Sequence, residues 1–327
     1  MRTSNGVQYP DSTAMAFAPV LFVCEESGCL ALEVTLTNGL QTVTATHDAF
    51  GGNAYVDMSD YVHGLFGRVD MPSSYASATA SGSMAQMTYF VRKRTSSGWT
   101  MAVNGGVTRF IWGALKRGET WGCNRYLVRT PGLPFCVDLY KLGSQTFNFR
   151  GGGRTAQVSA SSVGLWHVPI PSTFDGMDYV EVDDSLGTAI IRMDSCDDGI
   201  LLRWIDRHGL LCHRTFTKGT AGTESAISGE YRRNNLLDWD GSYGWRGMSG
   251  DGYVRTRTDT IEVCADGVRE EETAVLRDLA SSPMVEMYTG AAWVRVRIKQ
   301  GEWKLKETPL QDIEFTVIED DISLQRG

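Results

Sequence analysis

The sequence lacks any apolar run long enough to cross a lipid bilayer, which takes roughly 20 residues of helix. Residues 1–13 are polar and do not contain the apolar core of a secretory signal peptide. They include Pro10, and we predict a mobile arm or assembly tail there. We therefore expect a soluble chain that is made in the cytoplasm and does not insert into a membrane.

Positive charge is also scarce. The chain has 31 Lys and Arg residues against 39 Asp and Glu residues, which gives a formal net charge of −8 at pH 7. Because phosphate binding requires a basic surface, we do not expect nucleic acid as a partner. Arg255, Arg257, Arg295 and Arg297 fall on two predicted strands, and we interpret them as solvated strand faces rather than as a basic patch.

The sequence signatures of common catalytic and metal centres are missing. There is no HExxH, no GxSxG and no CxxC pair. His208 and His213 flank a predicted hairpin turn that contains Asp206, but this spacing has no specific ligand geometry. We predict that the protein is not an enzyme and that it has no catalytic residue, cofactor or metal.

The seven cysteines are odd in number and widely scattered, a pattern that does not predict a disulfide framework. Cys136 and Cys212 lie in apolar strand segments, so we expect buried free thiols in a protein made in a reducing compartment. Cys24 and Cys29 could bridge a hairpin under oxidising conditions.

Acidic residues gather in two segments: Asp175, Asp178, Glu181, Asp183 and Asp184, then Asp194, Asp197 and Asp198. A glycosidase needs two carboxyl groups at a set separation, which leaves an acid–base glycoside hydrolase as a third functional hypothesis. We favour the interpretation that these residues form turns, since Asp and Gly stabilise turns through the backbone.

The chain is rich in segments with the period-two alternation of β-strands. The fold class we predict is mainly β, with tandem small β-sandwich domains and a C-terminal β domain that carries one packed α-helix. The predicted parts are an N-terminal arm at 1–13, an immunoglobulin-like sandwich at 14–116, a second small β domain at 117–195, and the C-terminal domain at 196–327.

Two helices are expected in this strand-rich chain. The first covers 59–66, with Val62, Leu65 and Phe66 facing inwards. The second covers about 268–281, with Asp266 as its N-cap and an apolar face made of Val268, Val275, Leu276 and Leu279. A hairpin around Gly290 follows, and a last strand buries Ile313, Phe315 and Val317.

Three segments are predicted as loops. Residues 73–83 are small and polar, and residues 151–153 are three glycines that continue into a strand instead of a helix, which disfavours a phosphate cradle. Residues 218–253 form a long Gly-, Ser- and Asn-rich insertion, and a loop of that length is usually functional or ordered by a partner.

The long insertion contains the candidate site residues, which are Trp239, Tyr243, Trp245, Arg232, Arg233 and Arg246. Aromatic and arginine side chains are enriched in the energetically dominant centres of protein interfaces. Exposed aromatic rings with Asp and Asn neighbours also stack on sugars. We favour an interface and keep glycan contact as the alternative.

The C-terminal run "EEETAVLRDLASSPMVEMYTGAAWVRVRIKQGEWKLKETPLQDIEFTVIEDDISLQRG" resembles the end of tail structural proteins, of the distal tail or baseplate type, from tailed phages and prophages of gut bacteria. The N-terminal pieces "FAPVLFV", "DAFGGNAYVDMSDYVHGLF" and "FIWGALKRGE" resemble the openings of such proteins. The resemblance covers both ends of the chain and includes no catalytic signature.

The resemblance implies a virion structural protein that assembles as a ring near the distal tail, with the C-terminal unit as the assembly domain. Its expected partners are further copies of itself and other tail proteins. Its expected location is the virion tail, after synthesis in the cytoplasm of the bacterial host. The alternative is a carbohydrate-binding adhesin or receptor-binding module that attaches to a cell-surface glycan through residues 230–253.

Overall fold

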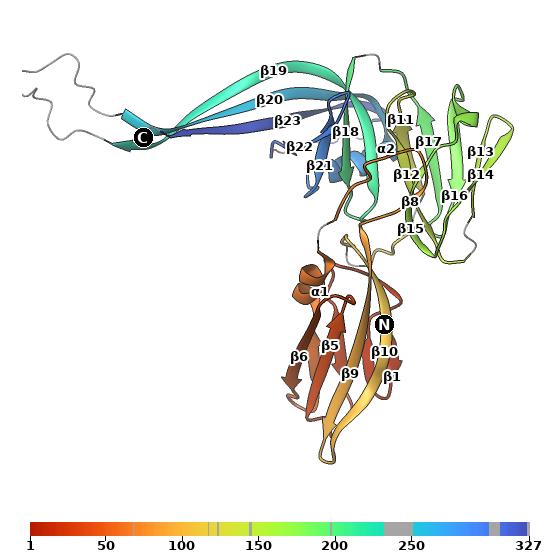
Figure 1. The fold of residues 1–327 in the computed structure, drawn as a ribbon, viewed down its shortest axis with the longest axis vertical. Helices are drawn as coiled ribbons and strands as arrows, with labels where there is room; N and C mark the ends of the chain where they lie inside the picture. Colours follow the sequence, from red (N-terminus) through yellow and green to blue (C-terminus); the bar gives the residue numbers. More distant parts are fainter. Residues whose placement is uncertain are drawn as a thin grey trace, which may run out of the picture. The chain divides into compact units, whose positions relative to one another are not determined.

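The structure is a computed structural model that describes residues 1–67, 69–116, 118–122, 124–143, 146–196, 198–231, 251–300 and 308–325. The chain divides into two compact units: Met1–Asp194 with Trp204–His213, and Ser195–Arg203 with Arg214–Gly327. The described residues form several β-sheets and two α-helices, which confirms the predicted mainly β fold class (Figure 1).

The first unit begins with a sandwich of two sheets. One sheet has the order β1-β2-β4-β7, with β1 (Arg2–Ser4), β2 (Val7–Tyr9), β4 (Leu21–Cys24) and β7 (Ala54–Asp57). The other has the order β3-β10-β9-β5-β6, with β3 (Thr13–Met15), β10 (Gly98–Ile111), β9 (Met84–Thr95), β5 (Ala31–Thr37) and β6 (Thr42–Asp48). Phe22 of one sheet and Tyr89 of the other are both buried, and their ring centroids lie 5.2 Å apart.

Residues 1–13 do not form the predicted mobile arm. β1 pairs with β2 in an antiparallel ladder, and β3 pairs with β10 in parallel. Val7 is fully buried, and the Arg2 guanidinium donates hydrogen bonds to the Tyr89 hydroxyl (2.8 Å) and the Val107 carbonyl (2.9 Å). These contacts stabilise a segment whose composition alone suggests mobility.

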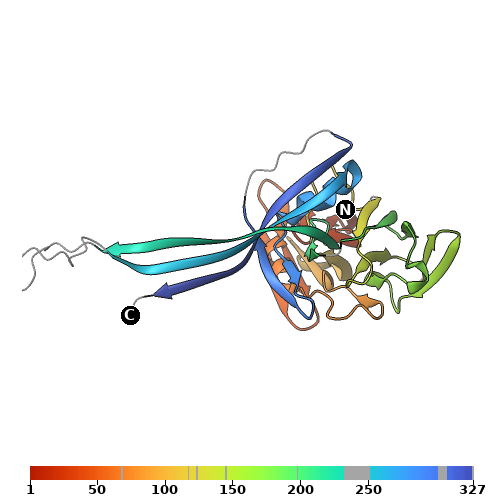
Figure 2. The ribbon, with the colours of Figure 1, turned by 90° about the horizontal axis from the view of Figure 1, so that it is seen from above.

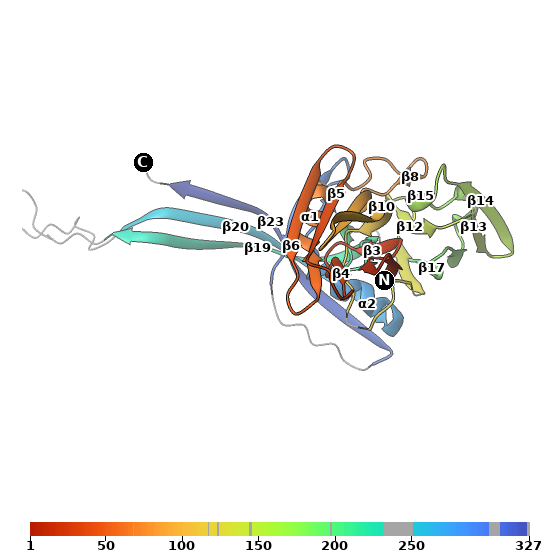
Figure 3. The ribbon, with the colours of Figure 1, turned by 90° about the horizontal axis from the view of Figure 1, so that it is seen from below.

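The first sandwich contains the expected short helix and hairpin. α1 (Ser59–Phe66) buries Val62, Leu65 and Phe66, as predicted. Asn38, in the turn between β5 and β6, accepts a hydrogen bond from the Gln41 N–H and donates one to the Leu65 carbonyl (2.8 Å each). The side chain of Asn38 therefore connects the β5–β6 hairpin with α1 (Figure 3).

A second sandwich completes the first unit. Its five-stranded sheet has the order β11-β17-β16-β13-β14, with β11 (Arg125–Arg129), β17 (Thr188–Met193), β16 (Tyr179–Asp183), β13 (Thr146–Gly151) and β14 (Arg154–Ser159). Its three-stranded sheet has the order β12-β15-β8, with β12 (Cys136–Lys141), β15 (Gly164–Pro169) and β8 (Thr79–Ala80). A short 3-10 helix, η1 (Ser172–Phe174), precedes β16.

Two loops predicted for this unit take part in strand pairing. Residues 79 and 80 form β8, which pairs with β15, so the segment 73–83 is not entirely a surface loop. Gly152 and Gly153 form the tight turn between β13 and β14, where their φ angles of 53° and 76° suit glycine.

The second unit contains a closed six-stranded sheet in the order β18-β19-β20-β23-β22-β21. Its strands are β18 (Gly199–Ile205), β19 (Leu211–Tyr231), β20 (Asp251–Arg269), β21 (Val285–Tyr288), β22 (Trp293–Ile298) and β23 (Leu310–Gln325). By its contacts, the first unit also includes residues 204 and 205 of β18 and the first three residues of β19. Phe216 and Phe315 are buried with ring centroids 5.5 Å apart, and Ile313 and Val317 are buried as predicted.

Helix α2 (Glu270–Leu279) starts later than predicted. Asp266 is not its N-cap, because β20 continues to Arg269 and the Asp266 carboxylate accepts a hydrogen bond from the Thr217 hydroxyl. Leu276 and Leu279 are buried as expected, but Val268 belongs to the strand and Val275 is half-buried. The buried face of α2 includes Glu272, Thr273 and Asp278.

The predicted hairpin around Gly290 is confirmed as β21 paired with β22. Arg295 and Arg297 are exposed and Val296 and Ile298 are buried, as predicted, but Val294 is also exposed. No helix among the described residues is long and apolar enough to cross a membrane.

The long insertion predicted at 218–253 is wrong at both of its ends, 218–231 and 251–253. β19 continues to Tyr231 and β20 starts at Asp251, and these two residues pair with each other. Residues 217–227 are all exposed, so the strand has no apolar face to produce the usual alternation in sequence. Only residues 232–250 of the insertion remain outside the described part of the chain.

Candidate functional site

The six predicted site residues, Trp239, Tyr243, Trp245, Arg232, Arg233 and Arg246, lie outside the described residues. Their assignment to an interface or a glycan site therefore stays a prediction. The segment that carries them leaves β19 after Tyr231 and enters β20 at Asp251, the last paired residues of that ladder. The strands that lead to it are described, and they form the most prominent feature of the second unit.

Three strands continue together beyond the closed sheet (Figures 1 and 2). We call residues 221–231 of β19, 251–261 of β20 and 319–325 of β23 the strand extension. β20 is its central strand, because it pairs with β19 as far as Tyr231↔Asp251 and with β23 as far as Val254↔Gln325. The views from above and below both show the three strands side by side.

The two outer edges of the strand extension are open along much of their length. β22 pairs with β23 only at Ile318 and Val317, so no described strand pairs with residues 319–325 on the edge of β23 that faces away from β20. On the other side, β18 has seven residues against the 21 of β19. Backbone N–H and C=O groups on open edges can pair with another strand. The extension therefore offers two edges suited to strand addition.

Polar contacts lie on one face of the strand extension, among residues 223–259 of β19 and β20 whose side chains are described. Thr223 donates a hydrogen bond to Asp259 (2.8 Å), and Arg257 forms an ion pair with the same carboxylate (2.9 Å). Hydrogen bonding from Arg257, and secondarily from Thr223, lowers the pKa of Asp259 below its ordinary value. Ile227 is 54% exposed and faces solvent among these polar residues.

A groove of about 610 Å³ lies at the base of this unit, where β22 and β23 separate. Its lining is Ala280, Ser282, Pro283, Val285, Arg295, Val296, Arg297, Ile298, Gln300, Ile318 and Glu319. Arg295 donates a hydrogen bond to the Pro283 carbonyl (2.6 Å). The groove therefore combines apolar residues with both signs of charge, as a surface that receives a polypeptide segment does.

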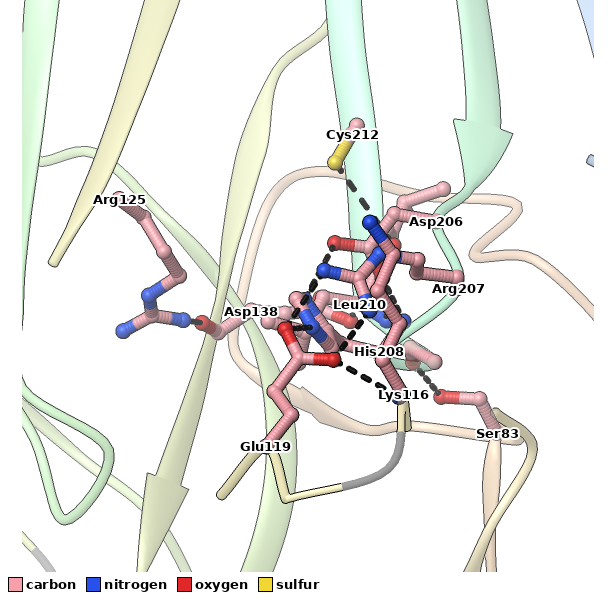
Figure 4. Close-up of polar contacts among 12 residues, drawn as sticks. Ser83, Lys116, Glu119, Arg125, Asp138, Asp206, Arg207, His208, Leu210 and Cys212 are labelled. Atoms are coloured by element: carbon pink, nitrogen blue, oxygen red, sulfur yellow. Dashed lines mark hydrogen bonds and ion pairs between the residues drawn. The ribbon is translucent and has the colours of Figure 1, made fainter. Parts of the chain in front are cut away.

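A polar cluster in the first unit holds the turn between β18 and β19 (Figure 4). The Arg207 guanidinium donates to both carboxylate oxygens of Glu119, at 2.5 and 2.6 Å. Glu119 also accepts a hydrogen bond from the Lys116 N–H (2.9 Å), and its Oε1 lies 3.3 Å from His208 Nε2. Within the turn, Asp206 accepts hydrogen bonds from the N–H groups of His208 and Leu210.

The pKa values of this cluster move in opposite directions. The hydrogen bonds from Arg207, followed by that from Lys116, hold the pKa of Glu119 well below its usual range. The hydrogen bond with Asp206 raises the pKa of His208, although its burial acts in the opposite direction. Both shifts favour the charged forms, so the cluster stabilises the turn electrostatically.

The histidines considered from sequence have separate partners. His208 contacts Glu119, whereas the Nε2 of His213 lies 3.0 Å from the Tyr75 hydroxyl, and its ring packs on Phe135. The structure therefore assigns each imidazole its own polar neighbour.

The first acidic segment supplies ion pairs to the second sandwich. Asp184 is fully buried and lies 2.9 Å from Arg125, while Asp183 contacts Arg150 (2.6 Å) and Asp175 contacts Arg129 (3.1 Å). Because each carboxylate has a guanidinium beside it, these three residues hold strands and loops together. In the second acidic segment, Asp194 contacts Arg192 (3.2 Å), and Asp197 lies outside the described residues.

Sequence reasoning missed a buried group of Cys136, Asp138 and His167. Asp138 Oδ1 and His167 Nδ1 lie 2.5 Å apart, and the three side chains are between 1% and 6% exposed. The alternation of Cys136 and Asp138 along one strand is readable from the sequence. The pairing of Asp138 with His167 depends on strand register, so it cannot be read from the sequence.

Cys24 and Cys29 are buried free thiols in this structure. Burial and the neighbouring Cys24 raise the pKa of Cys29 to about 11. Cys136 and Cys212 are likewise buried, as the sequence predicts. The raised pKa makes Cys29 a poor nucleophile.

No protein-family model matches the chain, and no curated protein matches it. Among solved structures, it is similar to one from work on host cell surface retention of a 1.5-MDa bacterial ice-binding adhesin, with 10% identity, 94% of this chain and 93% of that chain covered, and a TM-score of 0.18. It is also similar to Sidekick-1 immunoglobulin domains 1–5, with 10% identity, 79% of this chain and 55% of that chain covered, and a TM-score of 0.20. The chain thus spans about half the length of that second structure. Scores this low carry no argument about fold or function.

Proposed function

We propose that this chain is a structural subunit of a phage tail or tail-like particle and that it assembles into a ring near the distal tail or baseplate. The strand extension is the observation that carries the proposal, because it presents two open edges on one three-stranded sheet. The sequence resemblance supplies the type of particle. The strand extension is a feature of the structure and the resemblance is a feature of the sequence, so the two kinds of support are independent.

Open strand edges are a liability in a protein that acts alone, since they invite pairing with other chains. Natural monomers shorten, cover or bend such edges. Here β19 extends eleven exposed residues, 217–227, beyond its buried part. In a ring, the β19 edge of one copy can pair with the β23 edge of the next, so that every edge is covered.

The polar face of the extension agrees with this role. The Thr223–Asp259 and Arg257–Asp259 contacts keep one face polar and hydrated, which favours assembly through the edges. Main-chain pairing of this kind supplies affinity through hydrogen bonds, while side chains set the register. The groove between β22 and β23 adds a second contact surface of mixed polarity.

The decisive experiment measures the mass in solution of the full chain over a range of concentrations, by light scattering after size exclusion. We expect a closed oligomer, with rings visible by electron microscopy. A chain truncated after Glu319 loses the outer strand of the extension but keeps Ile318 and Val317, which pair with β22. It should remain monomeric, with an unchanged circular dichroism spectrum.

The double variant Trp239→Ala/Trp245→Ala tests the predicted aromatic interface separately, because it changes no residue of the strand extension, and self-association through these two side chains should weaken in it. Assembly that survives this variant and fails on truncation supports edge pairing. A full chain that is monomeric at every concentration contradicts self-assembly of the isolated subunit. A glycan screen would then follow, with sugar binding that is lost in the double variant as the result that favours the adhesin.

A further inference from the structure

The buried residues Cys136, Asp138 and His167 lie on one face of a two-stranded ladder in the second sandwich. β12 and β15 are antiparallel, and Asp138 is directly opposite His167 in the register. Cys136 precedes Asp138 by two residues, so both side chains point to the same side of the sheet. One donor atom from each of the three residues lies within 4.8 Å of the other two.

This spacing suits a single metal ion. Zinc binds thiolate sulfur at about 2.3 Å and imidazole nitrogen or carboxylate oxygen at about 2.0–2.2 Å, so neighbouring donor atoms on a tetrahedron are about 3.3–3.8 Å apart. Asp138 Oδ1 and His167 Nδ1 lie 2.5 Å apart, so they would separate by about 1 Å to bind one ion, a movement that side-chain rotation supplies. No rearrangement of β12 or β15 is needed.

The three residues are also sealed from solvent. Their exposed fractions are 2% for Cys136, 1% for Asp138 and 6% for His167. Nδ1 of His167 faces Asp138, but its buried Nε2 has no hydrogen-bond partner. An ion that replaces the Asp138–His167 hydrogen bond is bound through Nδ1, so Nε2 stays outside the set of donor atoms.

Neighbouring groups hold the carboxylate in place. Asp138 Oδ2 accepts a hydrogen bond from the Leu211 N–H (2.8 Å), which leaves Oδ1 directed at His167. Arg125 donates to the backbone carbonyl of Asp138. Ligating carboxylates in metal sites are fixed by hydrogen bonds of this kind.

We propose that Cys136, Asp138 and His167 form a buried zinc site that joins β12 to β15. A thiolate, an imidazole and a carboxylate match the borderline-soft Zn²⁺ and do not match Ca²⁺ or Mg²⁺, which take oxygen ligands. Three protein ligands leave one position of a tetrahedron to a non-protein ligand. This site is independent of the strand extension and of the proposed tail function.

Binding proceeds by exchange of protons for the cation. The proton between Asp138 and His167 and the proton of the Cys136 thiol are released as Zn²⁺ takes their place. No electron is transferred, and no bond other than those to hydrogen and the metal changes.

The test uses the full chain after treatment with a chelator, followed by titration with Co²⁺ alone. We expect one ion per chain and a thiolate-to-cobalt charge-transfer band that Zn²⁺ displaces. Cys136→Ser should abolish the band, and His167→Ala should weaken binding at least about tenfold. Cys29→Ser is the matched control, since it removes another buried thiol and should leave the band unchanged.

Two results would overturn the proposal. The first is a wild-type protein in which Co²⁺ produces no thiolate-to-cobalt band. This measurement does not depend on whether any variant folds. The other is a band that persists in Cys136→Ser, which would assign the thiolate to a different cysteine. A Zn²⁺-dependent increase in the melting temperature of the wild-type chain that Cys136→Ser lacks would support the site.

Discussion

Glu119 accepts hydrogen bonds from donors that are close in the sequence and from others that are far away. Lys116 is three residues before it, whereas Arg207 and His208 belong to the turn between β18 and β19. Because Arg207 is the main cause of the lowered Glu119 pKa, this single carboxylate makes stability dependent on pH. The sign of this pH dependence follows from the downward shift of the Glu119 pKa.

We expect Glu119→Gln to lower the free energy of unfolding of the first unit by about 1.5 to 3 kcal/mol at pH 7, the range for hydrogen bonds to charged groups. A carboxyl group whose pKa is depressed by folding stabilises the fold above its unfolded pKa, and this contribution is lost as the pH falls through the folded pKa. The difference between the wild type and the variant should therefore begin to shrink below about pH 4 and vanish only below the lowered pKa of the folded protein. Urea unfolding at pH 7 and pH 3 measures both effects.

Asp48→Asn is the control for that measurement. Asp48 also forms an ion pair, with Arg94 at 2.9 Å, but its side chain is 79% exposed. Its replacement should change the stability by less than about 1 kcal/mol at either pH. An equal loss for both variants would contradict a specific role for Glu119.

The buried residue groups were only partly readable from the sequence. Cys136 and Asp138 stand two apart in an apolar strand, so their common face could be predicted. His167 could not be placed beside them, because β15 itself was not predicted and register is a tertiary property. The contacts of Glu119 with Arg207 were hidden for the same reason, since 88 residues separate them.

At the level of elements, α2 illustrates how packing overrides local helix signals. Asp266 and Gly267 have the composition of a helix start, yet β20 continues to Arg269 because Val268 is fully buried in the sheet. The helix then buries Glu272 as well as leucines. Glu272 pairs with Arg214, 3.0 Å away, and both side chains are nearly inaccessible.

Removal of one partner of this buried pair should be costly. We expect Glu272→Ala to destabilise the second unit by about 3 to 5 kcal/mol, because Arg214 would remain charged and buried. Glu271→Ala, on the exposed side of the same helix, should change the stability by less than about 0.5 kcal/mol. The melting temperatures of the two variants are compared by thermal unfolding. Similar values would contradict the expected large effect of Glu272→Ala.

The strands themselves were predicted where one face is buried and missed where none is. β22 was found because Val296 and Ile298 alternate with arginines. Residues 217–227 of β19 have no buried face, so their composition resembles a loop. The β19 strand of the extension is therefore the part that sequence periodicity did not reveal, whereas Arg255 and Arg257 lie on its central strand, β20, which the sequence did predict.

At the scale of the whole molecule, charge opposes association. Each chain has a formal net charge of −8, so copies brought together in a ring repel one another. Edge pairing has to overcome this repulsion, which salt screens. The Debye length falls from about 30 Å at 0.01 M salt to about 3 Å at 1 M.

We therefore expect assembly to strengthen as the salt concentration rises from about 0.01 M to about 1 M. Sedimentation velocity at fixed protein concentration would follow the oligomer fraction, with the chain truncated after Glu319 as the control that stays monomeric throughout. Dissociation of the oligomer at high salt would indicate a contact made by opposite charges instead of backbone pairing.

The number of strands in the extension sets a direction for the whole assembly. β19 is antiparallel to β20 and β20 is antiparallel to β23, so the two outer strands run the same way. When the first strand of one copy joins the third strand of the next, the junction is parallel and every copy has the same orientation. Such a ring is polar: Tyr231 and Asp251 of all copies lie at one rim, and the two rims present different surfaces to whatever is stacked above and below.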